Sequence, residues 1–426
     1  MNLLKNIPDS WIKATVNKYC EVRLGKMLQT EPSSEKDELK PYLRAVNIAK
    51  AGLDLAHEFS MWITPAELER FRLLKGDILV SEGGDAGRTA VFDSENEYYF
   101  QNAINRIRPD SSNRVIPKFI YYWFIFLKVA GYVEMVCNVA TIPHFTAEKV
   151  KASPLVLPPI EIQQRIAQFL DERIERIDEL IEKKRVLLER LAEKRQVLIT
   201  RAVTKGLNPA IPLKPSGIDW LGDIPAHWDV SPLRRLLRSS TYGISASLEP
   251  IGEIAVLRMG NLVDGEINFG DLRFLDEIDE SLLLDTEDVV FNRTNSLDLV
   301  GKASIFRGNV DFPVSLASYL VRFRFTDEYA PEYANFVMGT EGLLSLARTL
   351  ALPSIGQANL NPSRYALIEF PIPPVREQSQ IVRYLVEETR RIQAIRDRVL
   401  CSLQQLADYR AALITAAVTG KIAGLQ

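Results

Sequence analysis

The sequence predicts an α+β fold in which two homologous mixed α/β globules alternate with two long helices. Three observations predict this fold: an internal repeat, short strand-like runs in the first part of each repeat, and a heptad pattern in the second part. We expect the two helices to form an antiparallel intramolecular coiled coil, which would give the chain pseudo-two-fold symmetry. The expected segments are 1–157 for the first globule, 158–207 for the first helix, 208–372 for a linker and the second globule, and 373–426 for the second helix.

The repeat is visible as pairs of matching segments. Residues 198–204 (LITRAVT) and 413–419 (LITAAVT) are separated by an offset of 215, and the same offset relates the Pro-Pro pairs at 158 and 373. Farther upstream the offset changes slightly. The matching segments there are 87–92 (GRTAVF) with 301–306 (GKASIF), and 7–11 (IPDSW) with 224–228 (IPAHW).

Each repeat has a globular part and a helical part. The globular part contains short β-rich runs, such as 77–80 (DILV) and 288–291 (DVVF), between turns that contain Gly, Asn and Ser. The helical part begins after a Pro-Pro pair, where a helix can start, and ends before Gly206 or Gly420, where a glycine can stop it. Each repeat therefore predicts one mixed globule followed by one long helix.

Apolar residues recur every seven positions in both helices, which is typical of a left-handed coiled coil. The two helices could pack on each other, or each could dock separately on its own globule. Arg195 and Arg410 interrupt the pattern at equivalent places, where they could fix the register or extend into solvent. The predicted seam consists of Leu170, Ile177, Leu191, Arg195 and Leu198 in the first helix and Leu385, Ile392, Val399, Leu406, Arg410 and Leu413 in the second.

The composition is that of an ordinary globular protein. Of the 426 residues, 46% are hydrophobic and 25% are charged, and this length allows several buried cores. The three cysteines, Cys20, Cys137 and Cys401, are odd in number and widely spaced, so we expect reduced thiols in a cytoplasmic protein. No apolar run is long enough to cross a membrane. The net charge of −3 lacks the basic excess typical of nucleic-acid binders.

The motifs of common catalytic sites are missing from the sequence. It has no phosphate-binding loop of the Gly-x-x-x-x-Gly-Lys-Ser/Thr type, no Gly-x-Gly-x-x-Gly turn and no His-Glu-x-x-His. None of the three histidines, His57, His144 and His227, has a metal partner at helical or turn spacing. The segment 208–211 (NPAI) lacks the aromatic residue of an amino-methyltransferase motif. We therefore expect a chain without catalytic residues, metal or cofactor of its own.

Three sets of motifs resemble one family, the specificity subunits of type I restriction-modification systems. These are residues 216–228 (SGIDWLGDIPAHW), the Pro-Pro-x-x-x-Gln starts at 158–163 and 373–378, and the two Leu-Ile-Thr-x-Ala-Val-Thr helix ends. The resemblance covers essentially the whole chain, including the order globule, helix, globule, helix.

The resemblance implies that the globules are target-recognition domains, each reading one half of an asymmetric bipartite site in double-stranded DNA. It also implies that the helices are conserved regions that set the spacer and dock two modification (methyltransferase) subunits. S-adenosylmethionine, and ATP with Mg, would belong to the partner subunits. The partners, including restriction (motor and nuclease) subunits, would carry out adenine methylation and ATP-dependent cleavage.

Bases are read most discriminately in the major groove, by Arg, Asn, Gln, Ser and Thr side chains among others. We therefore expect DNA contacts in loops that carry such residues and differ between the two copies, although any one of these residues could instead be an ordinary turn residue. The candidates are Arg44, Asn47, Ser81, Arg88, Thr141 and His144 in the first globule, and Arg258, Asn261, Asn292, Arg293, Asn295, Lys302, Ser354 and Gln357 in the second.

Two other classes of function are considered. A coiled-coil scaffold with two protein-binding globules and no DNA role would suit the nearly neutral charge, and a self-contained DNA methyltransferase would bind the cofactor directly. Binding to duplex DNA at two salt concentrations separates the scaffold from the DNA reader, because DNA binding weakens steeply with salt.

Overall fold

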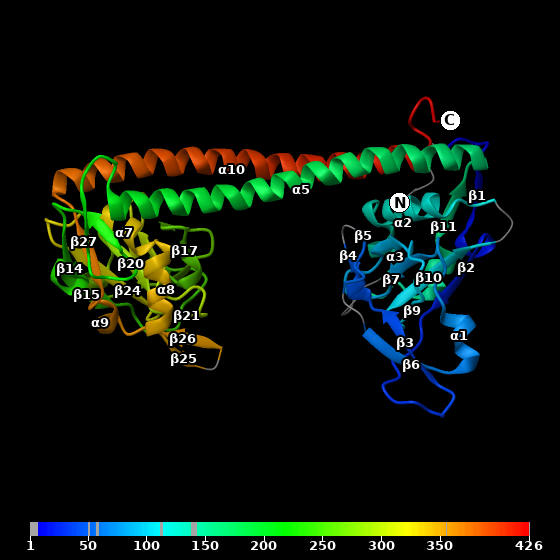
Figure 1. The fold of residues 1–426 in the computed structure, drawn as a ribbon, viewed down its shortest axis with the longest axis horizontal. Coiled ribbons are helices and arrows are strands. Elements are labelled where there is room, and N and C mark those ends of the chain that lie inside the picture. The colour runs from blue at the N-terminus through cyan, green and yellow to red at the C-terminus, as the bar shows by residue number, and fades with distance from the viewer. Residues whose placement is uncertain are drawn as a thin grey trace. The chain divides into compact units, whose positions relative to one another are not determined.

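The computed structural model describes residues 7–49, 52–56, 59–110, 114–137, 143–354 and 356–425. The chain forms two compact units, each of which contains one globule and a part of both long helices (Figure 1). Unit 1 comprises Met1–Arg185 with Leu400–Gln426, and unit 2 comprises Val186–Val399. Among the described residues, no helix is both long and apolar enough to cross a membrane.

The globule of unit 1 is built around a four-stranded antiparallel sheet in the order β2-β10-β7-β8, next to a three-stranded sheet in the order β6-β3-β9. The first strand, β1, pairs with the last strand of the globule, β11. The elements are β1 (Ile12–Thr15), β2 (Cys20–Leu24), β3 (Glu38–Leu43), β4 (Ile48–Ala49), β5 (Gly52–Leu53), β6 (Phe59–Ile63), α1 (Pro65–Phe71), β7 (Ile78–Ser81), β8 (Thr89–Val91), β9 (Tyr99–Phe100), β10 (Ile104–Pro109), α2 (Pro117–Val129), α3 (Tyr132–Val136), α4 (Ala147–Ala152) and β11 (Pro154–Leu157).

The globule of unit 2 has an equivalent central sheet, in the order β15-β24-β20-β22-β18-β17, and its strands β14 and β27 pair as β1 and β11 do. Its elements are β12 (Leu213–Pro215), β13 (Asp223–Pro225), β14 (Asp229–Pro232), α6 (Leu233–Leu236), β15 (Leu237–Tyr242), β16 (Ile254–Leu257), β17 (Leu262–Val263), β18 (Glu266–Ile267), β19 (Arg273–Leu275), β20 (Val289–Asn292), β21 (Thr294–Asn295), β22 (Ala303–Ile305), β23 (Val314–Leu316), β24 (Leu320–Phe325), α7 (Pro331–Met338), α8 (Glu341–Leu350), β25 (Leu352–Ser354), β26 (Gln357–Asn359), α9 (Pro362–Tyr365) and β27 (Glu369–Ile372).

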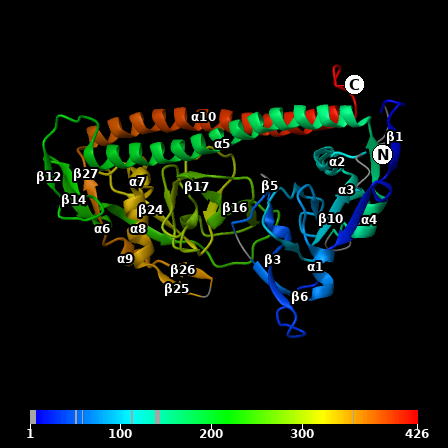
Figure 2. The ribbon, with the colours of Figure 1, turned by 45° about the vertical axis from the view of Figure 1, so that its right-hand side comes forward.

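The long helices are α5 (Ile160–Lys205) and α10 (Val375–Val418), and they lie side by side (Figures 1 and 2). In unit 1, the beginning of α5 packs against the end of α10, and in unit 2, the end of α5 packs against the beginning of α10, so the pair is antiparallel. Leu170 of α5 and Ile414 of α10 belong to the same core as the globule of unit 1, and Val203 and Leu385 do so in unit 2. The helices therefore pack on each other and on the globules at once.

Most positions of the predicted seam have little exposed surface. Six are buried and three are partly buried against the cores, while the two arginines are half-buried and make polar contacts. The Arg195 guanidinium donates to the Asp264 carbonyl at 3.0 Å, and Arg410 Nε lies 3.1 Å from Asp178 Oδ1 on α5. The buried members are Leu170, Ile177, Leu191, Leu385, Ile392 and Val399, and the partly buried ones are Leu198, Leu406 and Leu413.

One buried glutamine near the start of each long helix joins that helix to its globule. Gln163 accepts a hydrogen bond from the Ile116 backbone N–H at 2.9 Å and donates to the carbonyls of Arg114 and Pro158 at 3.0 and 2.9 Å. Ile116 is the N-cap of α2, whose first backbone N–H groups have no partner within the helix. The amide oxygen of Gln163 thus accepts one hydrogen bond and its NH₂ group donates two, all with backbone groups from two segments.

Gln378 makes the same three contacts in unit 2. It accepts from the N-cap residue of α7, Ala330, at 2.8 Å and donates to the carbonyls of Glu328 and Pro373 at 3.0 and 2.9 Å. The Pro-Pro-x-x-x-Gln motif therefore combines a helix start with a buried clamp, and we call each set of contacts the glutamine clamp.

Each long helix ends at a glycine that a tryptophan covers. Gly206 and Gly420 have φ angles of 71° and 73°, a conformation that residues with a Cβ rarely adopt. A Cβ on Gly206 would lie 3.3 Å from the Trp228 ring, and one on Gly420 would lie 3.0 Å from the Trp11 ring. The Ile-Pro-x-x-Trp motif of each unit is thus packed against the end of a long helix.

The glutamine clamp predicts a stability effect. Gln378→Leu would leave one buried backbone N–H and two carbonyls without partners, so we expect the free energy of unfolding to fall by about 2–4 kcal/mol. Denaturant unfolding measures this change. Gln404→Leu is the control, because exposed Gln404 contacts only Asp408 on the same helix and should change stability by less than about 0.5 kcal/mol. Equal effects of the two substitutions would show that the clamp contributes no more than an exposed glutamine.

A second prediction comes from one turn that differs between the repeats. The residue before the buried Asp77 is Gly76, with φ of 91°, whereas the residue before the equivalent Asp288 is Glu287, with φ of 72°. A non-glycine residue costs roughly 1–2 kcal/mol there. We therefore expect Glu287→Gly to raise the melting temperature and the free energy of unfolding, by about 1 kcal/mol. Glu277→Gly, at an exposed position without a positive φ, should not stabilise the protein.

Candidate nucleic-acid interface

Two of the expected DNA-contacting asparagines are buried in turns that they hold together. Asn47 accepts from the Arg44 backbone N–H at 2.8 Å and donates to the Asp54 carbonyl at 2.8 Å. Asn261 repeats this arrangement with the Arg258 N–H at 2.7 Å and the Asn268 carbonyl at 2.8 Å. Since both amides are occupied by the backbone of their own turn, neither is available to a base, and both are left out of the interface proposed below.

The arginines of the same two turns have different surroundings. Arg44 is exposed, and its guanidinium lies 4.6 Å from the centre of the Phe59 ring. Arg258 is half-buried and pairs with Asp271 at 2.7 Å.

The loop between β7 and β8 is shaped by two other candidates. Ser81 is buried, and its hydroxyl donates to the Asp85 carbonyl at 2.7 Å and accepts from the Arg88 N–H at 2.9 Å. The Arg88 guanidinium donates to the Ala45 carbonyl at 3.3 Å and thereby connects this loop to the turn of Arg44. Exposed His144 lies beside Gly83 of the same loop, and Thr141 lies outside the described residues. Three segments of the first globule thus converge here.

In unit 2 the equivalent loop joins a small sheet. Strand β21 pairs with β26, and β26 pairs with β25, which brings Asn295 to the strands that carry Ser354 and exposed Gln357. Asn292 is buried in β20, where its backbone N–H donates to the Lys302 carbonyl at 2.8 Å. The side chains of Arg293, Asn295 and Lys302 are half-buried.

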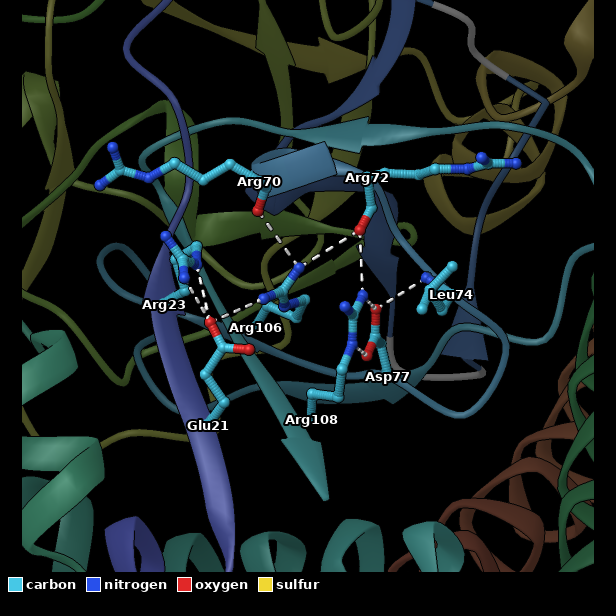
Figure 3. Close-up of polar contacts among 8 residues, drawn as sticks. All are labelled: Glu21, Arg23, Arg70, Arg72, Leu74, Asp77, Arg106 and Arg108. Carbon is cyan, nitrogen blue, oxygen red and sulfur yellow. Dashed lines mark hydrogen bonds and ion pairs between the residues drawn. The ribbon is translucent and has the colours of Figure 1, made fainter. Parts of the chain in front are cut away.

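Figure 3 shows a buried arginine network in the globule of unit 1 that was not predicted from the sequence. Arg106, buried in β10, donates to the carbonyls of Arg70 and Arg72 and lies 3.1 Å from Glu21 Oε1. Burial lowers the pKa of Arg106. Arg108 forms a two-pronged ion pair with buried Asp77, at 2.7 and 2.6 Å, and this contact raises the pKa of Arg108.

The same network recurs in unit 2. Arg324 pairs with buried Asp288 at 2.7 Å, and Arg322 donates to the Leu283 carbonyl at 2.6 Å. Two features of the sequence could have predicted this network. An Arg-x-Arg pair is present at 106–108 and again at 322–324, and each repeat has an aspartate earlier in the chain that is buried in the structure. Because these arginines are bonded to carbonyls and aspartates of their own globule, they stabilise its central sheet.

Each globule has a cavity at the equivalent place, between its first central-sheet strand and the short helix before its last strand. In unit 1 the cavity has a volume of about 630 Å³. Its charged lining residues are the basic Arg23, Arg70 and Lys151 and the acidic Glu21, Glu82 and Glu148. In unit 2 it has a volume of about 580 Å³ and is lined by Arg234, Arg364, Ser239, Ser240, Asn361 and Ser363. Within the described residues, no group of three His, Cys, Asp or Glu could hold a metal ion.

The chain is similar to proteins of one family. The model of the family described as "Type I restriction modification DNA specificity domain" matches residues 8–190. The specificity subunit of the type I restriction enzyme EcoKI from Escherichia coli (strain K12) is 23% identical, over 98% of this chain and 90% of its own length. The specificity subunit of StySPI from Salmonella potsdam is also 23% identical, over the same shares of both chains.

Solved structures share the fold. A chain from a study titled "Structural basis underlying complex assembly and conformational transition of the type I R-M system" superposes with a TM-score of 0.73 at 13% identity, covering 98% of this chain and 99% of that one. The HsdS subunit from Thermoanaerobacter tengcongensis gives 0.52 at 14% identity, with 99% and 100% covered. With two α/β globules, two packed long helices and relatives matched along nearly the whole length, the chain is similar in sequence and in fold to the specificity subunits of type I restriction enzymes.

Proposed function

We propose that residues 1–157 and 208–372 are target-recognition domains, each reading one half of an asymmetric bipartite site in double-stranded DNA. One observation carries this proposal: the two globules share their internal framework but differ in the loops that it supports. The glutamine clamp, the asparagine turns and the buried Arg-Asp network occur in both, whereas the residues after β7 and after β20 have different lengths and chemistry. Two different half-sites are the expected consequence.

The proposed base- and phosphate-contacting set leaves out only Asn47, Asn261 and Ser81, whose side chains are bonded within their own turns. As a specificity subunit, the chain is a non-catalytic member of its complex, so its contacts need only bind and discriminate. The set comprises Arg44, Arg88, Thr141 and His144 for the first half-site and Arg258, Asn292, Arg293, Asn295, Lys302, Ser354 and Gln357 for the second.

The proposed role of α5 and α10 is to set the spacer between the half-sites and to dock two modification subunits. Each unit presents one part of α5 against one part of α10, which supports two equivalent docking positions. S-adenosylmethionine, and ATP with Mg, would be held by the modification and restriction subunits. We propose that the chain works in the cytoplasm, where such a complex would meet cellular DNA.

Methylome sequencing tests the proposed function directly. In cells that carry the partner subunits, we expect adenine methylation at an asymmetric bipartite motif only when this chain is present. Binding of the purified complex to its motif should also weaken steeply between about 50 and 200 mM salt, because phosphate contacts release counterions. If no methylated motif depends on this chain, and if binding to DNA does not change with salt concentration, the protein scaffold is favoured instead.

The spacer function predicts the effect of lengthening both helices. Asp178 and Arg410 face each other, so points after Glu182 and after Gln405 lie opposite one another. One heptad inserted at each point preserves the seam and adds about 10 Å. We expect the preferred spacer to lengthen, by up to about three base pairs at ~3.4 Å each, while both half-site sequences stay unchanged. Selection from a library with randomised spacers measures this; an unaltered spacer would show that the helices only dock partners.

A further inference from the structure

One backbone position is built in the same way in both globules but carries opposite charges. Glu82 follows β7, and its backbone N–H donates to the Ala103 carbonyl at 2.9 Å while its carbonyl accepts from Phe145 at 2.7 Å. Arg293 follows β20 and makes the equivalent bonds, to Tyr319 at 3.1 Å and from Leu360 at 2.8 Å. Three chain segments therefore meet at this position in each unit, and only the side chain differs.

The Glu82 side chain has unused bonding capacity. It is half-buried, and among the described residues its buried Oε2 has no hydrogen-bond partner. Burial raises the pKa of Glu82, although the charge of His144 opposes this shift. A buried acceptor without a partner costs free energy, which an added hydrogen-bond donor would recover.

Glu82 lines a cavity that holds charges of both signs. The cavity has a volume of about 630 Å³ and is also lined by Arg23, Arg70 and Lys151, of which Arg23 pairs with Glu21 at 2.5 Å and Lys151 with Glu148 at 2.8 Å. Basic residues beside a carboxylate that they do not bond can contact the DNA backbone while the carboxylate accepts from a base.

Arg293 is a half-buried cation that is held in place without a counter-charge. Its guanidinium donates to Asn359 Oδ1 at 3.0 Å and to the Ser318 carbonyl at 3.4 Å, and lies 5.3 Å from the centre of the Tyr242 ring. Within the described part of the chain, no carboxylate lies within ion-pair distance of it, unlike Arg258 or Arg307. A ring and two neutral acceptors therefore fix the plane of the guanidinium and leave its charge uncompensated.

From this pairing we propose that Glu82 and Arg293 are equivalent specificity-determining residues, one for each half-site. The proposal rests on the function proposed above. The Glu82 carboxylate accepts a hydrogen bond from the amino group of a cytosine, and the Arg293 guanidinium donates to O6 and N7 of a guanine, which are the pairings that the major-groove edges of these bases favour.

The test selects binding sites from DNA in which both half-sites are randomised, using the complex of the full chain with its modification subunits. Arg293→Gln should reduce the preference for guanine at one position of one half-site by at least about fivefold, the lower end of what a bidentate contact gives. Arg293→Lys should retain it, since an ammonium still donates to O6 and N7. Glu82→Gln should reduce a cytosine preference in the other half-site only. The matched controls are Arg238→Gln and Glu95→Gln, which remove exposed charges paired on the surface.

Each result has a definite meaning. A motif that is unchanged in Arg293→Gln or in Glu82→Gln would overturn the proposal, as would a loss of binding to both half-sites by a variant whose melting temperature is unchanged. The unaltered half-site in each variant is an internal control for folding. If the unsubstituted chain selects no bipartite motif at all, the proposed function fails, and this outcome is distinct from a failure of the residue assignment.

Discussion

A single buried amide fixes each globule to the long helix that follows it. Gln163 and Gln378 each satisfy one N–H and two carbonyls where the globule ends and the helix begins, and a buried backbone group without a partner is costly. Because one side chain must reach all three groups at about 3 Å, the direction in which the helix leaves the globule is set by hydrogen-bond geometry. The hydrophobic cores shared by helices and globule reinforce that direction.

Each globule combines buried residues that both repeats share with loop residues that differ between the repeats. Residues that the two repeats have in common, such as Asp77 and Asp288, are buried and bonded to their own unit. Residues that differ, such as Glu82 and Arg293, lie where strands end and loops begin. A scaffold of this kind lets a loop change its chemistry at little cost to the fold, because the bonds that orient the loop are made by backbone atoms.

The sequence allowed the architecture to be predicted, because repeats, heptads, Pro-Pro pairs and stop glycines are local or periodic signals. It allowed much less of the interface to be predicted. Asn47, Asn261 and Ser81 belong to residue types that read bases, yet their groups are bonded within their own turns, and those bonds depend on carbonyls whose positions the fold decides. Glu82 lies in the predicted loop between Ser81 and Arg88, but the sequence does not single it out, because only the folded loop leaves its Oε2 buried and without a partner among the described residues.

The packing of the last turns of α10 has a consequence for the order in which the protein is finished on the ribosome. Ile414, Ala417 and Val418 complete the same core as Trp11, so the globule of unit 1 lacks part of its interior until residues 414–418 have been synthesised. Unit 2 ends at Val399 and is complete earlier. The globule of unit 1 therefore keeps apolar surface uncovered while the whole of unit 2 is synthesised, and exposed apolar surface of this kind favours aggregation during folding.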